Sequence, residues 1–290
     1  MNLPPPDTRA GRVRFRVISM EDGMTLRQLL GRRLGLGVGP ASDLVKAGGV
    51  YIGAVRTCIP TLRVREGERV TVYRGAAERA PVDPDALVIV HRDESCVVID
   101  KPHGVPAGAA REGQRGAISQ AVVQRLAREG VLRPYVGLVH SLEAEAAGLI
   151  LFTIRGQDRA SFFQRFAELD VRRVYRARLR GQVSGPLVCE AGLVRAGGEL
   201  RVARGGEEAA PARTEFRPLG GGDAATLVEL ELRASARVEQ VPLHARALGH
   251  ELVEEDGLLA LACVRMAFTH PLSGAELDLR ATPPPWAAPG

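Results

Sequence analysis

A stretch rich in alanine, proline and charged residues, 75–85, divides the sequence into two parts. It has neither the apolar periodicity of a helix nor the alternation of a strand, which is typical of a linker. The total length of 290 residues allows two domains, each with its own core. We therefore expect a disordered tail at 1–12, a small domain at 13–75, a linker at 76–85, a larger domain at 86–284 and a short tail at 285–290.

The first part opens with two helical patterns. Thr25 suits a helix N-cap, and four leucines follow it at helical spacing: Leu26, Leu29, Leu30 and Leu34. Pro40 suits the first turn of a second helix, which runs over 41–46 and stops at two glycines. Strands are predicted at 50–52, 63–65 and 69–73, with Gly53 as the turn after the first of them.

The second part has the pattern of one mixed α/β domain. Apolar runs predict strands, and apolar residues at helical spacing predict two helices. The expected strands are 87–90, 96–99, 149–153, 174–179 and 226–232, and the expected helices are 118–129 and 159–169. The glycine-rich piece at 184–213 is expected to form short strands and a mobile loop.

Composition narrows the class of protein. No apolar run reaches the roughly 18 residues of a membrane-spanning helix, and the polar N-terminus lacks the apolar core of a signal peptide, so we expect a cytoplasmic protein. The four cysteines show no C-x-x-C spacing, so buried thiols are expected and no metal site or disulfide framework.

The net charge of +5 comes almost entirely from arginine, because Lys46 and Lys101 are the only lysines. Two explanations remain open. Arginine suits phosphate, since its planar fork donates two hydrogen bonds at once. A GC-rich coding sequence gives the same excess of arginine, together with the abundant alanine, glycine and proline.

Three segments of the first part resemble the ribosomal-protein S-four-type RNA-binding domain. They are T-L-R-Q-L-L-G-R-R-L-G (25–35), D-L-V-K-A-G-G-V-Y-I-G (43–53) and V-R-E-G-E-R-V (64–70). The resemblance implies that basic side chains on the two helices hold RNA backbone. The candidates are Arg27, Arg32, Arg33 and Lys46, and the alternative is that they are solvated surface charges.

Six segments of the second part, in the same order, resemble the RluA-type RNA pseudouridine synthases. They are V-V-I-D-K-P-H-G-V-P (97–106), V-H-S-L-E-A-E-A-A-G-L-I-L-F (139–152), R-V-Y-R-A-R-L-R-G (173–181), A-R-T-E-F (212–216), A-S-A-R-V-E-Q-V-P-L-H-A-R-A-L-G-H (234–250) and F-T-H-P-L-S-G (268–274). The implied fold is α+β: the small helix–helix–strand domain, then a mixed, mainly antiparallel sheet with flanking helices.

This family isomerises uridine to pseudouridine in RNA without a metal or an organic cofactor. Its members flip the target base out of the RNA, where a carboxylate attacks and an aromatic ring stacks. The resemblance therefore implies structured RNA, ribosomal RNA above all, as the partner. The sequence gives no signal of oligomerisation, so we expect a monomer.

At the matching positions, the family's catalytic aspartate is Glu143 and its stacking tyrosine is Tyr175. The remaining residues expected to contact RNA, or to pair with the carboxylate, are Arg173, Arg237, Gln240 and His140. Arg237 is the expected cationic partner of Glu143.

Several supporting groups of the family are replaced. The arginine before the carboxylate is Ser141, the following hydroxyl pair is alanine, the family's histidine is Glu239, and its last arginine is Pro242. We therefore expect Glu143 to lie near other carboxylates, which raises the pKa of a carboxyl group. Two functions follow: an isomerase that uses Glu143, or a catalytically degenerate relative that binds RNA without turnover.

Overall fold

The computed structural model describes residues 7–9, 12–53, 55–73, 82–108, 116–140, 142–167, 171–233, 238–255 and 257–288. The chain forms two compact units. The first comprises Met1–Leu87 and Gly108–Val136, and the second comprises Val88–Ala107 and Gly137–Gly290. Helix α3 (Ile118–Arg128) thus belongs to the first unit, whereas the sequence placed it in the larger domain. No helix among these residues has the length and apolar character that crossing a membrane requires.

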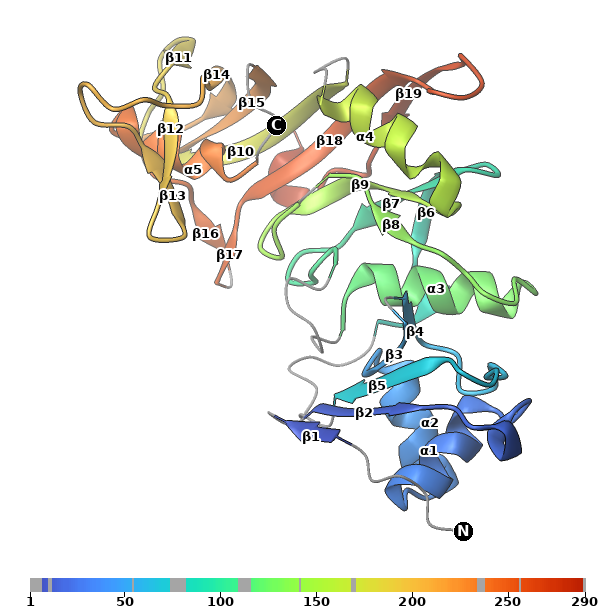
Figure 1. The fold of residues 1–290 in the computed structure, drawn as a ribbon. Coiled ribbons are helices and arrows are strands. Elements are labelled where there is room, and N and C mark those ends of the chain that lie inside the picture. The colour runs from blue at the N-terminus through green and yellow to red at the C-terminus, as the bar shows by residue number, and fades with distance from the viewer. Residues whose placement is uncertain are drawn as a thin grey trace. The chain divides into compact units, whose positions relative to one another are not determined.

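The first unit contains a five-stranded antiparallel sheet in the order β1-β2-β5-β3-β4 (Figure 1). Its strands are β1 (Asp7–Arg9), β2 (Arg12–Arg16), β3 (Val50–Ile52), β4 (Val55–Thr57) and β5 (Arg69–Tyr73). Helices α1 (Leu26–Leu34) and α2 (Val38–Lys46) complete the core, with Leu26, Leu29 and Leu30 fully buried. The remaining regular pieces are the 3-10 turns η1 (Ser19–Glu21) and η2 (Pro84–Ala86).

Local capping explains where α1 begins and ends. The Gln28 side chain accepts a hydrogen bond from the Thr25 backbone N–H at 2.9 Å, and Gly35 ends the helix in the left-handed conformation at φ 66°. Both helices and the strand at 50–52 are confirmed, and α2 begins two residues before Pro40. The order of helix, helix, strand and glycine turn is the expected one.

Two expectations for this unit differ from the structure. The predicted strand at 63–65 is wrong, because it is reduced to a single antiparallel bridge between Arg63 and Thr25: Leu62 O accepts from Leu26 N, and Val64 N donates to Met24 O. Part of the expected disordered tail, Asp7–Arg9, is strand β1, while 1–6 and 10–11 lie outside the described residues. Most of the expected linker, 76–81, also lies outside them.

A ten-stranded sheet dominates the second unit, with the main order β11-β14-β15-β10-β18-β9-β7-β6 (Figure 1). Within the described residues, the pair β9–β18 is parallel and every other pair is antiparallel, which confirms the expected α+β class. The strands are β6 (Val88–Arg92), β7 (Cys96–Lys101), β8 (Gly137–Leu138), β9 (Ala147–Thr153), β10 (Arg172–Arg180), β11 (Leu187–Cys189), β14 (Arg213–Gly221), β15 (Ala225–Arg233), β18 (Leu261–Thr269) and β19 (Glu276–Arg280).

Smaller elements surround this sheet. Helices α4 (Arg159–Ala167) and α5 (Gln240–Ala247) flank it, together with the 3-10 turns η3 (Gly156–Asp158) and η4 (Pro285–Ala287). The glycine-rich piece contains the hairpin of β12 (Leu193–Ala196) and β13 (Glu199–Val202), and a second small ribbon joins β16 (Glu254–Glu255) to β17 (Leu258–Leu259). All four cysteines are buried, as expected, and none of them forms a disulfide.

Gly148 is where β9 and β18 meet most closely. It pairs with Cys263 in the parallel register, and its φ is 100°. A Cβ atom at this position would lie 2.1 Å from the carbonyl oxygen of Cys263. The glycine therefore lets the strand that follows Glu143 lie directly against the centre of the sheet.

We expect Gly148→Ala to destabilise the second unit by about 3 kcal/mol or more, because the new methyl group meets backbone that cannot yield and the φ is strained. Urea unfolding followed by circular dichroism measures the loss. Gly185→Ala is the matched control, since Gly185 has open space around it and ordinary backbone geometry. Equal stability of the two variants would contradict this account of the β9–β18 contact.

Candidate active site

The loop that carries Glu143 is fixed by a buried lysine. Lys101, 1% exposed at the end of β7, donates from Nζ to Val105 O (2.8 Å), Pro102 O (3.1 Å) and Ala144 O (3.3 Å). The Gly104 N–H donates to the same Ala144 carbonyl at 2.8 Å. An ammonium group has three donors and no acceptor, so three carbonyls satisfy it away from water. The segment after β7 thus holds the backbone beside Glu143.

Glu143 itself is exposed, and its pKa is raised. Partial burial of the carboxyl group is the largest cause, Glu239 and Glu145 add like charge, and Lys101 opposes them. The expectation that Glu143 lies near other carboxylates is confirmed. Arg237, the expected cationic partner, lies outside the described residues, as do Ser141 and Ala236.

Tyr175 lies in the middle of β10, between Leu230 of β15 and Cys263 of β18, and has no exposed surface. Burial raises its pKa strongly. Arg173 and the Cys263 thiol lie beside its hydroxyl, yet within the described part of the chain that oxygen makes no bond of good hydrogen-bond geometry. A nucleobase cannot stack on this ring unless the groups that cover it move.

Arg173 and His140 are also integrated into the core. The guanidinium carbon of Arg173 lies 5.7 Å from the centre of the Phe166 ring, and the His140 ring stacks on Phe166 at 5.2 Å with an interplanar angle of 10°. Nε2 of His140 accepts a hydrogen bond from the backbone N–H of Leu151. Both side chains are buried, so neither presents its polar group to a surface ligand in this structure.

Gln240 belongs to a buried chain of hydrogen bonds that joins α5 to β14. Its Nε2 donates to Thr214 Oγ1 at 2.9 Å, and Thr214 Oγ1 lies 2.8 Å from His244 Nδ1. Nε2 of His244 lies 2.9 Å from Ala191 O, which accepts only, so the Nε2–H tautomer is assigned and Thr214 donates to Nδ1. Burial lowers the pKa of His244 and favours this neutral form.

Pro242 stands in α5 where the motif resemblance implies an arginine. It is the third residue of the helix, in the first turn, where backbone N–H groups have no partner within the helix. The substitution therefore removes a cation without breaking a helical hydrogen bond. The helix keeps its structural contacts through Gln240 and His244, while Glu239 at its start supplies the negative charge that Glu143 senses.

The basic candidates of the first unit fall into two groups. Nε of Arg33 lies 2.7 Å from the fully buried Glu21 carboxylate, and its guanidinium lies 5.2 Å from the Phe15 ring centre, so this charge is neutralised within the fold. Arg32 and Lys46 are exposed, and Arg27 is half-buried. Arg32 and Lys46 are thus the side chains best placed to meet a ligand.

Sequence patterns missed a groove of about 540 Å³ in the first unit. Its lining comes from three segments: Asp22 and Gly23, 59 and 61–65, and the end of α3 with the residues that follow it. Arg133, which lines the groove, pairs with Glu68 at 2.8 Å, and Leu132 is 85% exposed. No short motif predicts such a groove, because these three segments lie far apart in the chain.

Comparison with known proteins identifies the family of the chain. Residues 95–244, about half of the chain, match the family of RNA pseudouridylate synthases. The chain is 28% identical over 146 residues to an uncharacterized RNA pseudouridine synthase of Aquifex aeolicus, covering 48% of this chain and 46% of that one. It is 28% identical over 251 residues to ribosomal large subunit pseudouridine synthase C of Escherichia coli, covering 77% of this chain and 74% of that protein.

Solved structures give the same fold. The human RNA pseudouridylate synthase domain containing 1 superposes with a TM-score of 0.58 at 19% identity, covering 72% of this chain and 89% of that one. The chain spans about half the length of the Aquifex relative and about three quarters of the Escherichia coli one. Because this family match spans residues 95–244, about half of the chain, the chain belongs to the RNA pseudouridylate synthase family.

Proposed function

We propose that this protein binds structured RNA as a member of the pseudouridine synthase class and isomerises uridine through Glu143. Ribosomal RNA is the favoured substrate, because the Escherichia coli relative is named for the large ribosomal subunit. The observation that carries the proposal is the position of Glu143, an exposed residue with a partly buried carboxyl group, on a loop held by Lys101. We place this activity in the cytoplasm, in a monomer.

In this proposal, Glu143 acts as nucleophile or base toward a flipped uridine and must be ionised to do so. Its side chain is one methylene longer than the family's aspartate. A misplacement of about 1 Å costs roughly a hundredfold in rate. Turnover is therefore slow, and binding of the nucleotide has to be coupled to a movement that uncovers Tyr175.

The second candidate is RNA binding without turnover. Two observations favour it: Glu239 and Glu145 raise the pKa of Glu143, and the Tyr175 ring has no exposed surface. A neutral carboxylic acid is a poor nucleophile, and an acidic lining repels phosphate. In this case the fold serves as a clamp on RNA or on ribosome precursors.

The two functions separate in one experiment with purified full-length protein and ribosomal RNA, in which pseudouridine is mapped after incubation. We expect slow product formation by the natural protein, none by Glu143→Ala, and up to about a hundredfold faster formation by Glu143→Asp, which restores the shorter carboxylate. No product with any of the three proteins, together with salt-sensitive RNA binding, would establish the non-catalytic alternative.

The pH dependence of the same reaction tests the state of Glu143. Because its pKa is raised, the reactive carboxylate forms at a higher pH than in an ordinary glutamate, so the rate rises with pH through that raised value. Of the two neighbouring carboxylates, Glu239 raises the pKa of Glu143 more, so Glu239→Gln should shift the pH profile of the rate to lower pH. An unchanged profile in this variant would rule out electrostatic coupling between the two carboxylates.

RNA binding by the first unit rests on Arg32 and Lys46. We expect the double variant Arg32→Gln, Lys46→Gln to weaken binding and to lower the slope of log affinity against log salt by about 1.5, as the loss of two phosphate contacts predicts. Fluorescence anisotropy at several salt concentrations measures it. The control is Arg217→Gln, Arg246→Gln, which removes the same charge from exposed positions of the second unit. Equal slopes in the two double variants would show that α1 and α2 do not contact the RNA.

A further inference from the structure

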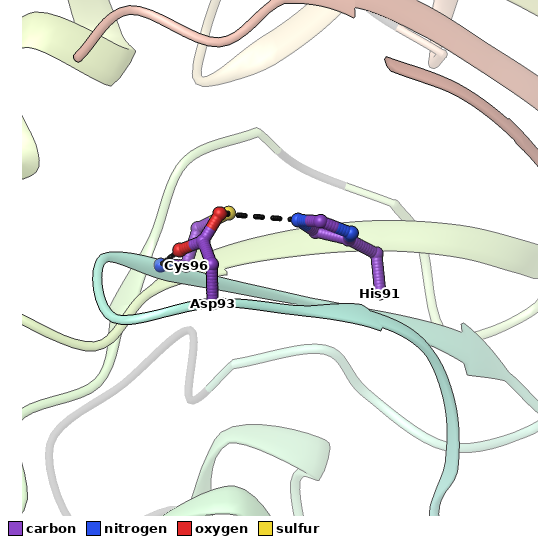
Figure 2. A group of neighbouring side chains, drawn as sticks. All are labelled: His91, Asp93 and Cys96. Atoms are coloured by element: carbon purple, nitrogen blue, oxygen red, sulfur yellow. Dashed lines mark hydrogen bonds and ion pairs between the residues drawn. The ribbon is translucent and has the colours of Figure 1, made fainter. Parts of the chain in front are cut away.

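Three potential metal ligands converge at the hairpin between β6 and β7. His91 lies in β6, Asp93 in the turn and Cys96 at the start of β7, and their ligand atoms all lie within 4.8 Å of one another (Figure 2). Asp93 Oδ2 lies 3.1 Å from His91 Nε2 and 3.5 Å from Cys96 Sγ. None of these residues takes part in the proposed isomerisation.

We propose that His91, Asp93 and Cys96 form a zinc site. Zinc in proteins binds imidazole nitrogen at about 2.0 Å, carboxylate oxygen at about 2.1 Å and thiolate sulfur at about 2.3 Å. Tetrahedral geometry then separates nitrogen from oxygen by roughly 3.3 Å and oxygen from sulfur by roughly 3.6 Å. The two shorter separations in the structure, 3.1 and 3.5 Å, already fit these values.

The two oxygens of the Asp93 carboxylate have different partners. Oδ1 accepts the backbone N–H groups of Ser95 (2.7 Å) and Cys96 (2.8 Å), which fixes the orientation of the side chain. Oδ2 is thereby aimed at His91 and Cys96 (Figure 2). This is the arrangement that holds a metal-binding carboxylate in place from outside the coordination shell.

His270 lies beside the cluster but is not a ligand. Its Nδ1 accepts the backbone N–H groups of Leu272 and Ser273, so the ring proton is on Nε2. That Nε2 lies 3.2 Å from Asp93 Oδ2, is buried, and has no hydrogen bond of good geometry within the described residues. Zinc sites with three protein ligands hold a water molecule in the fourth position. Such a water would give this buried N–H an acceptor.

The donor set selects the metal. A thiolate with an imidazole favours zinc and excludes magnesium and calcium, which take oxygen ligands. The His91 and Asp93 side chains are 23% and 33% exposed, which gives the ion a path from solvent to the buried thiol. Zinc binding forms the Zn–S bond and releases one proton from that thiol to the solvent.

The test uses the full-length protein, stripped with a chelator and titrated with zinc against a competing indicator. We expect one zinc ion per chain. His91→Gln and Cys96→Ala should each weaken binding at least about a hundredfold, since the loss of an outer-shell partner alone costs ten- to a hundredfold. Neither change touches the two backbone bonds of Asp93, so the hairpin remains. Controls are His250→Gln and Cys189→Ala, which remove the same chemical groups elsewhere in the second unit.

Cobalt substitution provides an independent readout. Cobalt in the natural protein should show a thiolate-to-metal charge-transfer band that disappears in Cys96→Ala. Absence of stoichiometric zinc binding, equal affinity in the ligand and control variants, or a cobalt spectrum without that band would each overturn the proposal.

Discussion

The ammonium group of Lys101 is the contact on which the candidate site depends. It occupies the end of β7 and gathers three backbone carbonyls, one of them next to Glu143. Together with the Gly104 N–H, which donates to the same Ala144 carbonyl, this buried charge fixes the loop before β9 to the segment after β7. The close approach of Gly148 to Cys263 secures the other end of the same loop. Glu143 thus lies between two anchors, one made by the Lys101 side chain and one by the backbone of Gly148 and Cys263.

The motif resemblance implies one electrostatic change at the candidate site. Serine, alanine, glutamate and proline stand where the resemblance implies cationic and hydroxyl residues. Pro242 occupies a helix position that needs no N–H, and Gln240 and His244 still bind α5 to the sheet. Helix α5 therefore keeps the residues that attach it to the sheet but carries proline where a cation is expected. The structural role persists, and the charge that remains, Glu239, acts against ionisation of Glu143.

Periodicity and capping predicted most elements, because these are local properties. Thr25 and Gln28 mark the start of α1, and the apolar runs at 96–99 and 149–153 became paired central strands. The segment at 63–65 was predicted wrongly as a strand, since its backbone forms hydrogen bonds with the residues around the start of α1 and, in the described part of the chain, with no strand. Local patterns cannot tell which of two partners a backbone segment will bind.

The candidate site was less accessible to sequence reasoning. Motif order placed Glu143 and Tyr175, but burial is a tertiary property, and the covered ring of Tyr175 had no sequence signal. Arg33, His140 and Gln240 looked like ligand contacts, yet Glu21, Phe166 and Thr214 engage them within the fold. Cysteine spacing alone also passed over His91 and Asp93, because a hairpin turn brings different ligand types together without a C-x-x-C signature.

Burial of the His244 imidazole makes the stability of the protein depend on pH. In the unfolded chain this histidine takes up a proton below about pH 6.5, whereas the folded state, in which its pKa is lowered, resists it. Acid therefore favours the unfolded chain, and the contribution of this residue to stability falls as the pH drops below that value. Acidity would therefore act on the hydrogen bond that joins His244 of α5 to Thr214 of β14.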